Sequence, residues 1–339
     1  TCCAGWKIVI DKKSLNKYKH VKGKFWFTML KSVDWIRGIF RQDKEKRCAF
    51  LNDCNLCEMY VNLGEKSLCK TCRLYPRHVE EFEDVREITL SVSCPEVARI
   101  LMEKKEPVRF LTYEKEGEEE YEEFDPFLYS MLVDARDAIL GMAHDLQGRF
   151  NREQLFSCEE VIERYQTKSA RKFVRKLWKE EKPSVQEKWE MAHKMFRELY
   201  ELELLREDWD MLLMESEELL YSHGADAYKG ISSDFKRWAK EESNIQIQAE
   251  QLLVYFIFTY FCGAVYDGRI YAKVQMAVIS TFHIYELWKA RWIKNEGELT
   301  PEEIVELVYR YSREIEHSDK NLERMEKMML RDRLPWYRG

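Results

Sequence analysis

The residues of this chain most suited to chemistry are its cysteines, because six of the ten fall within residues 48–94. Cys54 and Cys57 form one C-x2-C pair, Cys69 and Cys72 form another, and eleven residues lie between the pairs. A C-x2-C turn lets two thiolates converge on one ion, so two such turns can complete a tetrahedral sulfur site. The spacing therefore predicts a metal or iron–sulfur site. Buried free thiols are an alternative, and a disulfide framework is typical of much shorter secreted chains.

A further cysteine, Cys94, precedes Pro95 and a run of apolar residues that predicts a helix with proline at its first position. The Cys94 sulfur would then lie at a helix N-terminus, where the dipole and free N–H groups favour a thiolate and hence a metal ligand. A Cys-Pro pair also ends the ligand run of bacterial ferredoxins.

Composition limits the class of protein. The formal net charge of −6 argues against nucleic-acid binding, which needs a basic face. A length of 339 residues with 45% hydrophobic content allows two domains with full cores. Ten cysteines with this spacing fit a reducing compartment, so we expect a cytoplasmic protein. Because the chain begins with Thr1 rather than Met, we expect the natural N-terminus to lie further upstream.

The elements that must position the cysteines form a small α+β module, which we expect over residues 1–112. Residues 113–125, which are rich in glutamate, are expected to form a solvated acidic loop or linker. Within the module, periodicity predicts short strands at residues 6–10 and 108–113, a largely helical stretch at 14–30, and a hairpin or short strands at 82–92.

Residues 126–339 have the pattern of a helical domain. Trp189, Ala192 and Phe196 continue one apolar face over successive turns. Thr300 and Glu303 form a capping box with Pro301 at the first helical position, which predicts a helix start. The expected fold class is mainly α, a cysteine-rich α+β metal-binding module followed by a helical bundle.

The most apolar stretch, residues 252–266, is shorter than the roughly twenty residues of a membrane span. We therefore expect a helix buried within the bundle and no membrane span. Cys158 and Cys262 are expected to be buried, inert thiols. Nucleotide-binding and hydrolase motifs are absent, and His193, His223 and His283 stand singly, so a structural or exposed role is expected for each.

The order of motifs CCAGWKIVID, RCAFL, NLCEMYVNLGEKSLCKTCRLYPR and LSVSCPEVARIL, with LLVYFIFTYFCGAVYDG near the C-terminus, resembles the flagellin lysine N-methylase family over nearly the whole chain. The first part also resembles a broader zinc- or iron-chelating cysteine-rich family, in which a CC motif precedes C-x2-L, C-x-I-Y and a Cys-Arg pair. Those motifs fall here at Cys2 and Cys3, at Cys48, at Cys57, and at Cys72 with Arg73.

The resemblance implies methyl transfer from S-adenosylmethionine to lysine side chains of flagellin, dependent on a [4Fe–4S] cluster or, alternatively, on zinc. Cys54 departs from the family pattern and becomes a bystander, and another family cysteine is expected upstream of Cys2. The metal ligands implied are Cys2, Cys3, Cys48, Cys57, Cys69, Cys72 and Cys94.

Methylating an amine requires a neutral lysine, a sulfonium methyl in line with its lone pair, and exclusion of water. Desolvation and a nearby base can supply the neutral amine, and aromatic rings can hold the cations. Tyr75, Arg77 and His78 follow the second C-x2-C pair, so we expect them to contact the methyl donor or substrate. The alternative role for these three residues is a structural loop packed on the metal site. The catalytic base is not assigned.

Two other classes of function fit the same cysteines. One is a non-enzymatic zinc-binding interaction protein with a helical scaffold, which would hold one zinc and show no visible chromophore. The other is an electron-transfer or radical enzyme, although the C-x3-C-x2-C run typical of radical chemistry is not found in this sequence.

Overall fold

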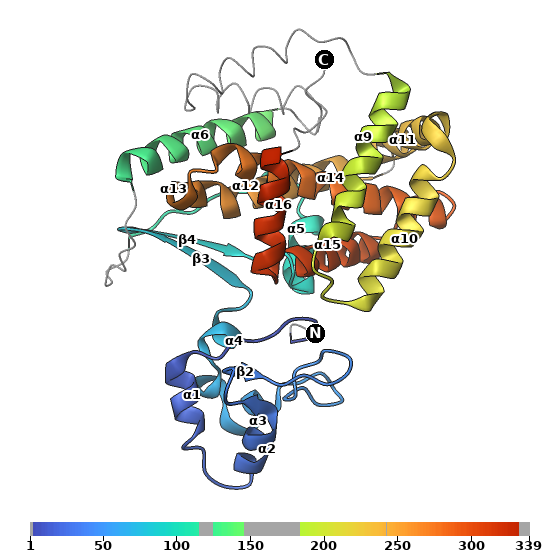
Figure 1. Cartoon of the computed structure of the whole chain (residues 1–339). Helices are drawn as coiled ribbons and strands as arrows, with labels where there is room; N and C mark the ends of the chain where they lie inside the picture. Colours follow the sequence, from blue (N-terminus) through green and yellow to red (C-terminus); the bar gives the residue numbers. More distant parts are fainter. Residues whose placement is uncertain (1–2, 115–124, 146–183, 242, 332–339) are drawn as a thin grey trace.

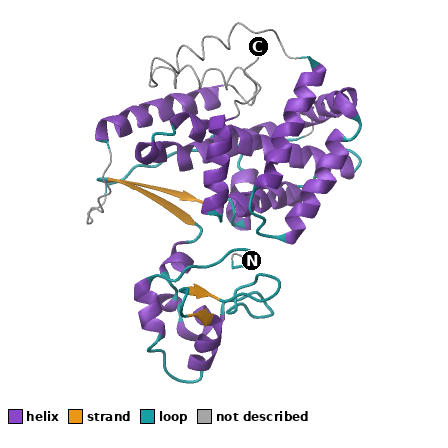
Figure 2. Ribbon diagram, in the orientation of Figure 1, coloured by secondary structure: helices purple, strands orange, loops and turns teal. Residues whose placement is uncertain are grey.

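The computed structural model describes residues 3–114, 125–145, 184–241 and 243–331. Cys2, Cys158 and nearly all of the acidic run lie outside these residues. The described chain forms two lobes, a cysteine-rich lobe (residues 3–74) and a helical lobe (residues 77–331), as Figure 1 shows. Figure 2 shows that helices predominate and that strands form only two small sheets. The predicted fold class, mainly α, is confirmed.

The cysteine-rich lobe is built from short elements around its own apolar core, which includes Ile8, Tyr18, Met29, Phe40 and Phe50. The strands β1 and β2 are antiparallel. Its elements are α1 (Lys12–Tyr18), α2 (Phe25–Ser32), β1 (Val33–Asp34), β2 (Ile39–Phe40), α3 (Glu58–Leu63), the 3-10 turn η1 (Glu65–Ser67) and α4 (Lys70–Leu74).

Two sequence predictions in this lobe need correction. The helix expected over residues 14–30 is two helices, because the chain turns between them and Gly23 adopts φ +85°, a left-handed conformation that glycine tolerates. The strand expected over residues 6–10 is only extended chain, with one isolated bridge from Val9 to Ile39.

The link to the helical lobe is an antiparallel hairpin of β3 (Arg77–Phe82) and β4 (Val85–Leu90), followed by α5 (Pro95–Glu103). The hairpin was predicted, although it begins five residues earlier than expected. Cys94 is the N-cap of α5 and Pro95 opens the helix, as predicted. The strand predicted over residues 108–113 is wrong, because that segment has no regular structure.

The helical lobe confirms the predicted bundle. Phe82, Val92, Ala98 and Met102 belong to its core, so the hairpin and α5 pack with the helices and not with the cysteine-rich core. Its remaining elements are α6 (Pro126–Asp145), α9 (Val185–Arg197), η2 (Glu198–Glu201), α10 (Glu207–Tyr221), α11 (Gly224–Glu241), α12 (Ile245–Tyr260), η3 (Phe261–Gly263), α13 (Ala264–Asp267), α14 (Ile270–Lys294), α15 (Pro301–Glu316) and α16 (Asp319–Arg331).

The centre of the bundle is formed by α12 and α14, whose side chains are buried almost all round. Within the described residues, one helical segment, Ile245–Asp267, is long and apolar enough to cross a membrane, and 78% of its most apolar window is buried inside the protein. This burial is what a core helix requires and agrees with the predicted buried helix. The capping box of Thr300 and Glu303 is also present at the start of α15.

Candidate metal centre

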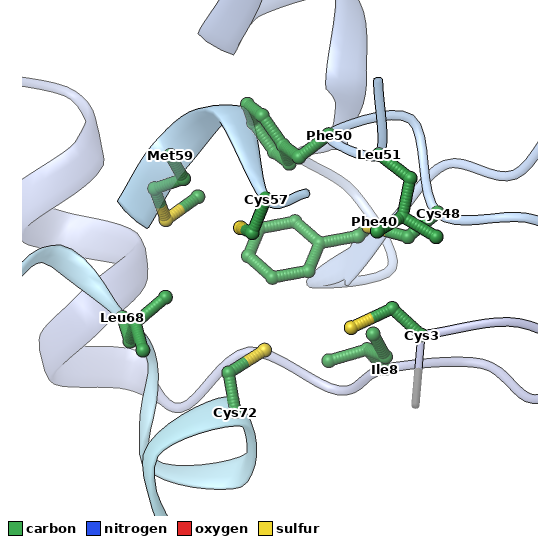
Figure 3. A pocket seen from close by; sticks show the side chains of 10 residues that line it. All are labelled: Cys3, Ile8, Phe40, Cys48, Phe50, Leu51, Cys57, Met59, Leu68 and Cys72. Atoms are coloured by element: carbon green, nitrogen blue, oxygen red, sulfur yellow. The ribbon is translucent and has the colours of Figure 1, made fainter. Parts of the chain in front are cut away.

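Four cysteine side chains from four separate segments line one cavity in the cysteine-rich lobe: Cys3, Cys48, Cys57 and Cys72. In Figure 3 the sulfurs of Cys3, Cys57 and Cys72 point toward the middle of this space. The cavity measures about 10 Å³, which is room for about one water molecule. Its remaining walls are apolar, formed by Ile8, Phe40, Phe50, Leu51, Met59 and Leu68.

Backbone pairing brings these segments together. The Cys48 N–H donates to the Cys3 carbonyl at 2.9 Å, and Cys57 bridges to Leu51 before it caps α3. Asp11 accepts from the Lys70 N–H at 2.8 Å while also capping α1, so one carboxylate fixes the start of α4 against the N-terminal segment. The cysteines therefore meet because of local capping and bridging, not through long strands.

Cys69 and Cys72, at the start of α4, share a hydrogen bond. Cys69, the N-cap of this helix, is fully buried, and a hydrogen bond from the Cys72 thiol lowers the pKa of Cys69 from 9.0 to about 7. The same bond, together with burial, raises the pKa of Cys72. One thiolate is thus available near neutral pH, which is the form that binds a metal.

The donor set fits a thiolate-bound metal. Four cysteine sulfurs around one point are the ligands of structural zinc and of iron–sulfur clusters. In the part of the chain that the structure describes, no three His, Cys, Asp or Glu side chains already stand at ligating geometry. Binding of an ion would therefore require the thiols to turn further into the cavity, and a four-iron cluster would require the segments to move apart.

The other cysteines predicted from the sequence lie elsewhere or cannot be placed. Cys94 caps α5 and does not line the cavity. Cys54, expected to be a bystander, is exposed in a turn where its N–H donates to the Asn52 side chain. Cys2 lies outside the described residues. Cys262 is buried in the helical lobe, where burial raises its pKa to about 12, as expected for an inert thiol.

The three predicted contact residues follow α4 directly. Tyr75 and His78 are half-buried, whereas Arg77 is exposed at the first position of β3. The His78 Nε2 lies 2.8 Å from Glu80 Oε1, and the His78 ring centroid lies 5.7 Å from that of Tyr260. Two of the three residues therefore face the helical lobe.

A polar network at the junction of the lobes has no sequence motif to reveal it. His317 Nε2 lies 2.9 Å from Ser93 Oγ, which is also 3.1 Å from the Tyr75 hydroxyl. Beside it, the Glu316 carboxylate accepts hydrogen bonds from Tyr255 and Tyr260 at 2.6 and 2.9 Å. These residues come from α12, from the ends of α4 and α15 with their C-caps, and from the chain before α5. A helix ending in Glu-His has an ordinary charged C-terminus by sequence, so only the fold brings the network together.

The structure combines a thiol-lined cavity with a helical bundle, and comparison with known proteins identifies the family. The family model of the FliB lysine N-methylase C-terminal domain matches residues 131–334. The chain therefore belongs to the FliB lysine N-methylase family. No solved structure matches it.

Curated relatives agree with this family. The lysine-N-methylases of Salmonella typhimurium and Salmonella choleraesuis are each 30% identical over 113 residues, which cover 30% of this chain and 27% of the relative. The flagellar biosynthetic protein FliU of Salmonella muenchen is 33% identical over 109 residues, 30% of this chain and 64% of that protein. The match thus spans about a quarter of the lysine-N-methylases and just under two thirds of FliU.

Proposed function

We propose that this protein transfers methyl groups from S-adenosylmethionine to lysine side chains of flagellin, in the cytoplasm, and that transfer depends on a metal centre in the cysteine-rich lobe. Family membership and the names of the lysine-N-methylase and FliU relatives support the reaction and its flagellar substrate. The observation that carries the metal dependence is the convergence of four cysteines on one cavity.

The residues that would hold the metal centre are Cys3, Cys48, Cys57 and Cys72, with Cys69 beside them. We propose a [4Fe–4S] cluster, which when bound supplies an electron-transfer or open-iron centre. The protein's own contribution is a thiolate maintained near neutral pH by the Cys69–Cys72 hydrogen bond and apolar walls that keep water away. Cys2 and Cys94 remain predicted ligands.

Tyr75 and His78 remain our proposed contacts to the methyl donor or the substrate lysine. Both are half-buried where the cysteine-rich lobe meets the helical lobe, and an aromatic surface there can hold a sulfonium or an ammonium by cation–π attraction. Arg77 is more exposed, so its proposed contact is with the surface of the protein substrate.

The reaction is tested by incubating anaerobically purified, metal-loaded protein with flagellin and methyl-labelled S-adenosylmethionine. We expect label on flagellin lysines, located by mass spectrometry. Flagellin with its lysines already blocked by acetylation should take up none. Absence of label from unblocked flagellin, with the metal centre loaded, would refute the proposed reaction.

A second function is favoured by the small size of the cavity. A space of about 10 Å³ suits one ion better than a four-iron cube, as expected for a structural zinc site in a non-enzymatic interaction protein. That function predicts one zinc per chain, no visible chromophore, no methyl transfer, and unfolding of the cysteine-rich lobe by chelators.

A further inference from the structure

We propose that the polar and aromatic cluster around Glu316, where the two lobes meet, binds the methyl-accepting lysine and that the Glu316 carboxylate is its proton acceptor. This inference rests on the proposed methyl transfer and assigns the acceptor site within it. We call this cluster the Glu316 site, formed by Trp6, Tyr75, Tyr255, Tyr260, Glu316 and His317.

Several hydroxyl groups donate hydrogen bonds to the Glu316 carboxylate. Its Oε2 accepts from Tyr255 and Tyr260, and from Ser91 Oγ at 3.2 Å, while its Oε1 accepts from Ser312 Oγ at 2.5 Å. Glu316 is half-buried and is the last residue of α15. Because the C-terminal end of a helix carries partial negative charge, the helix and the carboxylate both favour a cation at this point.

Three other glutamates of the helical lobe have a cationic partner. Glu286 pairs with Lys289 at 2.5 Å, and Glu87 pairs with Arg136 at 2.6 Å. Glu326 pairs with Arg269 at 3.1 Å and also with Lys273. Among the ion pairs of the described residues, none includes Glu316. Four hydroxyls satisfy the Glu316 carboxylate, and an incoming lysine ammonium would add the opposite charge in a partly desolvated place.

Aromatic rings lie around His317, the residue that follows Glu316. The Trp6 and His317 ring centroids lie 4.6 Å apart, and the Tyr75 ring lies 5.9 Å from His317. Rings of this kind attract both an ammonium and its methylated product. Trp6 follows Cys3 by three residues and Tyr75 follows Cys72 by three, so the segments that carry the thiols also carry the rings. The Glu316 site and the candidate metal centre thus share two chain segments.

The chemistry balances in two steps. An N–H bond of the lysine ammonium breaks and its proton moves to the Glu316 carboxylate, which leaves a neutral amine. The amine lone pair then forms a bond to the methyl carbon of S-adenosylmethionine as the C–S bond breaks, and that electron pair stays on sulfur. Burial raises the pKa of Glu316, which suits a group that must take a proton and later release it to solvent.

The test compares Glu316→Gln with Glu314→Gln, which removes a buried carboxylate from the same helix two residues away. Glu314 accepts from the Leu205 N–H at 2.9 Å and is not part of the Glu316 site. We expect Glu316→Gln to lower kcat/KM for a flagellin acceptor about 100-fold at pH 7.5, the usual range for loss of a general base. Glu314→Gln should stay within about threefold of the unaltered protein.

The pH profile separates a base from a structural group. In Glu316→Gln the rate should rise about tenfold per pH unit toward the lysine pKa, because solvent then deprotonates the ammonium. Glu316→Asp, which keeps a carboxylate, should recover part of the rate at pH 7.5. Other charged or titratable groups facing this point are His78 and Glu80 of β3, Tyr75, the two tyrosines of α12, and Arg313 and His317 near the end of α15.

A binding measurement tests the Glu316 site separately from the proposed methyl transfer. A flagellin peptide with a single lysine should bind the unaltered protein at least tenfold more tightly than Glu316→Gln in calorimetry, with equal metal content in both. Binding without any methyl transfer would refute the proposed reaction but support this site. Equal binding by both proteins, no binding by either, or a flat pH profile in Glu316→Gln would overturn it.

Discussion

His283 makes the stability of the helical lobe depend on acid in a predictable direction. Its ring is fully buried, Nε2 lies 2.9 Å from the Met195 carbonyl, and Nδ1 lies 3.2 Å from the Tyr311 hydroxyl. Since a carbonyl can only accept, Nε2 carries a proton, and in the neutral imidazole Nδ1 accepts from the tyrosine. Desolvation lowers the pKa of His283 from 6.5 to about 4.

The direction and size of the change in stability with pH follow from the difference between the unfolded and folded pKa values of His283. The unfolded chain takes up a proton on His283 below pH 6.5, whereas the folded protein resists it until about pH 4. The stabilising contribution is therefore complete above pH 6.5 and is lost as the pH falls. By linkage, about 2–3 kcal/mol of the free energy of unfolding is lost between pH 7.5 and 4.5 through this residue.

The assay is urea-induced unfolding followed by circular dichroism at several pH values from 7.5 to 4.5, for the unaltered protein and for His283→Gln. Glutamine can still donate to the Met195 carbonyl but does not titrate. We expect the variant to be less stable at pH 7.5. Between pH 7.5 and 4.5, its free energy of unfolding should fall by about 2–3 kcal/mol less than that of the unaltered protein. Parallel loss of stability in both proteins over this range would refute the assignment.

Three further changes test other parts of the structure. Glu87→Gln leaves the buried Arg136 guanidinium without its carboxylate and should lower the free energy of unfolding by about 3–5 kcal/mol, measured by urea titration; a loss below about 1 kcal/mol would contradict this. Cys72→Ala should abolish metal binding measured by elemental analysis, whereas Cys262→Ala should keep the metal and lose about 1–2 kcal/mol in core packing; equal retention of metal would show the ligand assignment to be wrong. Thr300→Ala removes an N-cap and should lower the melting temperature through a loss of about 1 kcal/mol, and an unchanged melting temperature would argue against the cap's contribution.

The sequence alone predicted those structural features that depend on interactions between neighbouring residues. The capping box of Thr300 and Glu303 and the Cys94–Pro95 helix start depend on residues within one turn, and both are present as predicted. Residues 252–266 were placed inside the bundle because their apolar character extends around the whole helix. The C-x2-C spacing also identified Cys57 and Cys72, two of the four thiols that line the cavity.

Other features depend on tertiary packing, which the sequence does not reveal. Residues 108–113 have strand-like composition, but Phe110 stacks on Phe258 of α12 at 4.3 Å and the segment pairs with no strand. The division between the lobes falls before the hairpin, because Phe82 and its neighbours pack on the helices. The Glu316 site joins segments more than 200 residues apart, so no spacing rule could have found it.

The most direct measurement is the metal content of the anaerobically purified protein, with iron, acid-labile sulfide and zinc determined alongside the visible spectrum. We expect a broad visible band with roughly four irons and four sulfides per chain, and their loss in Cys72→Ala. A colourless protein holding one zinc would contradict the iron–sulfur centre and support a structural zinc site. A metal-free protein with intact methyl transfer would contradict the dependence of the reaction on these cysteines.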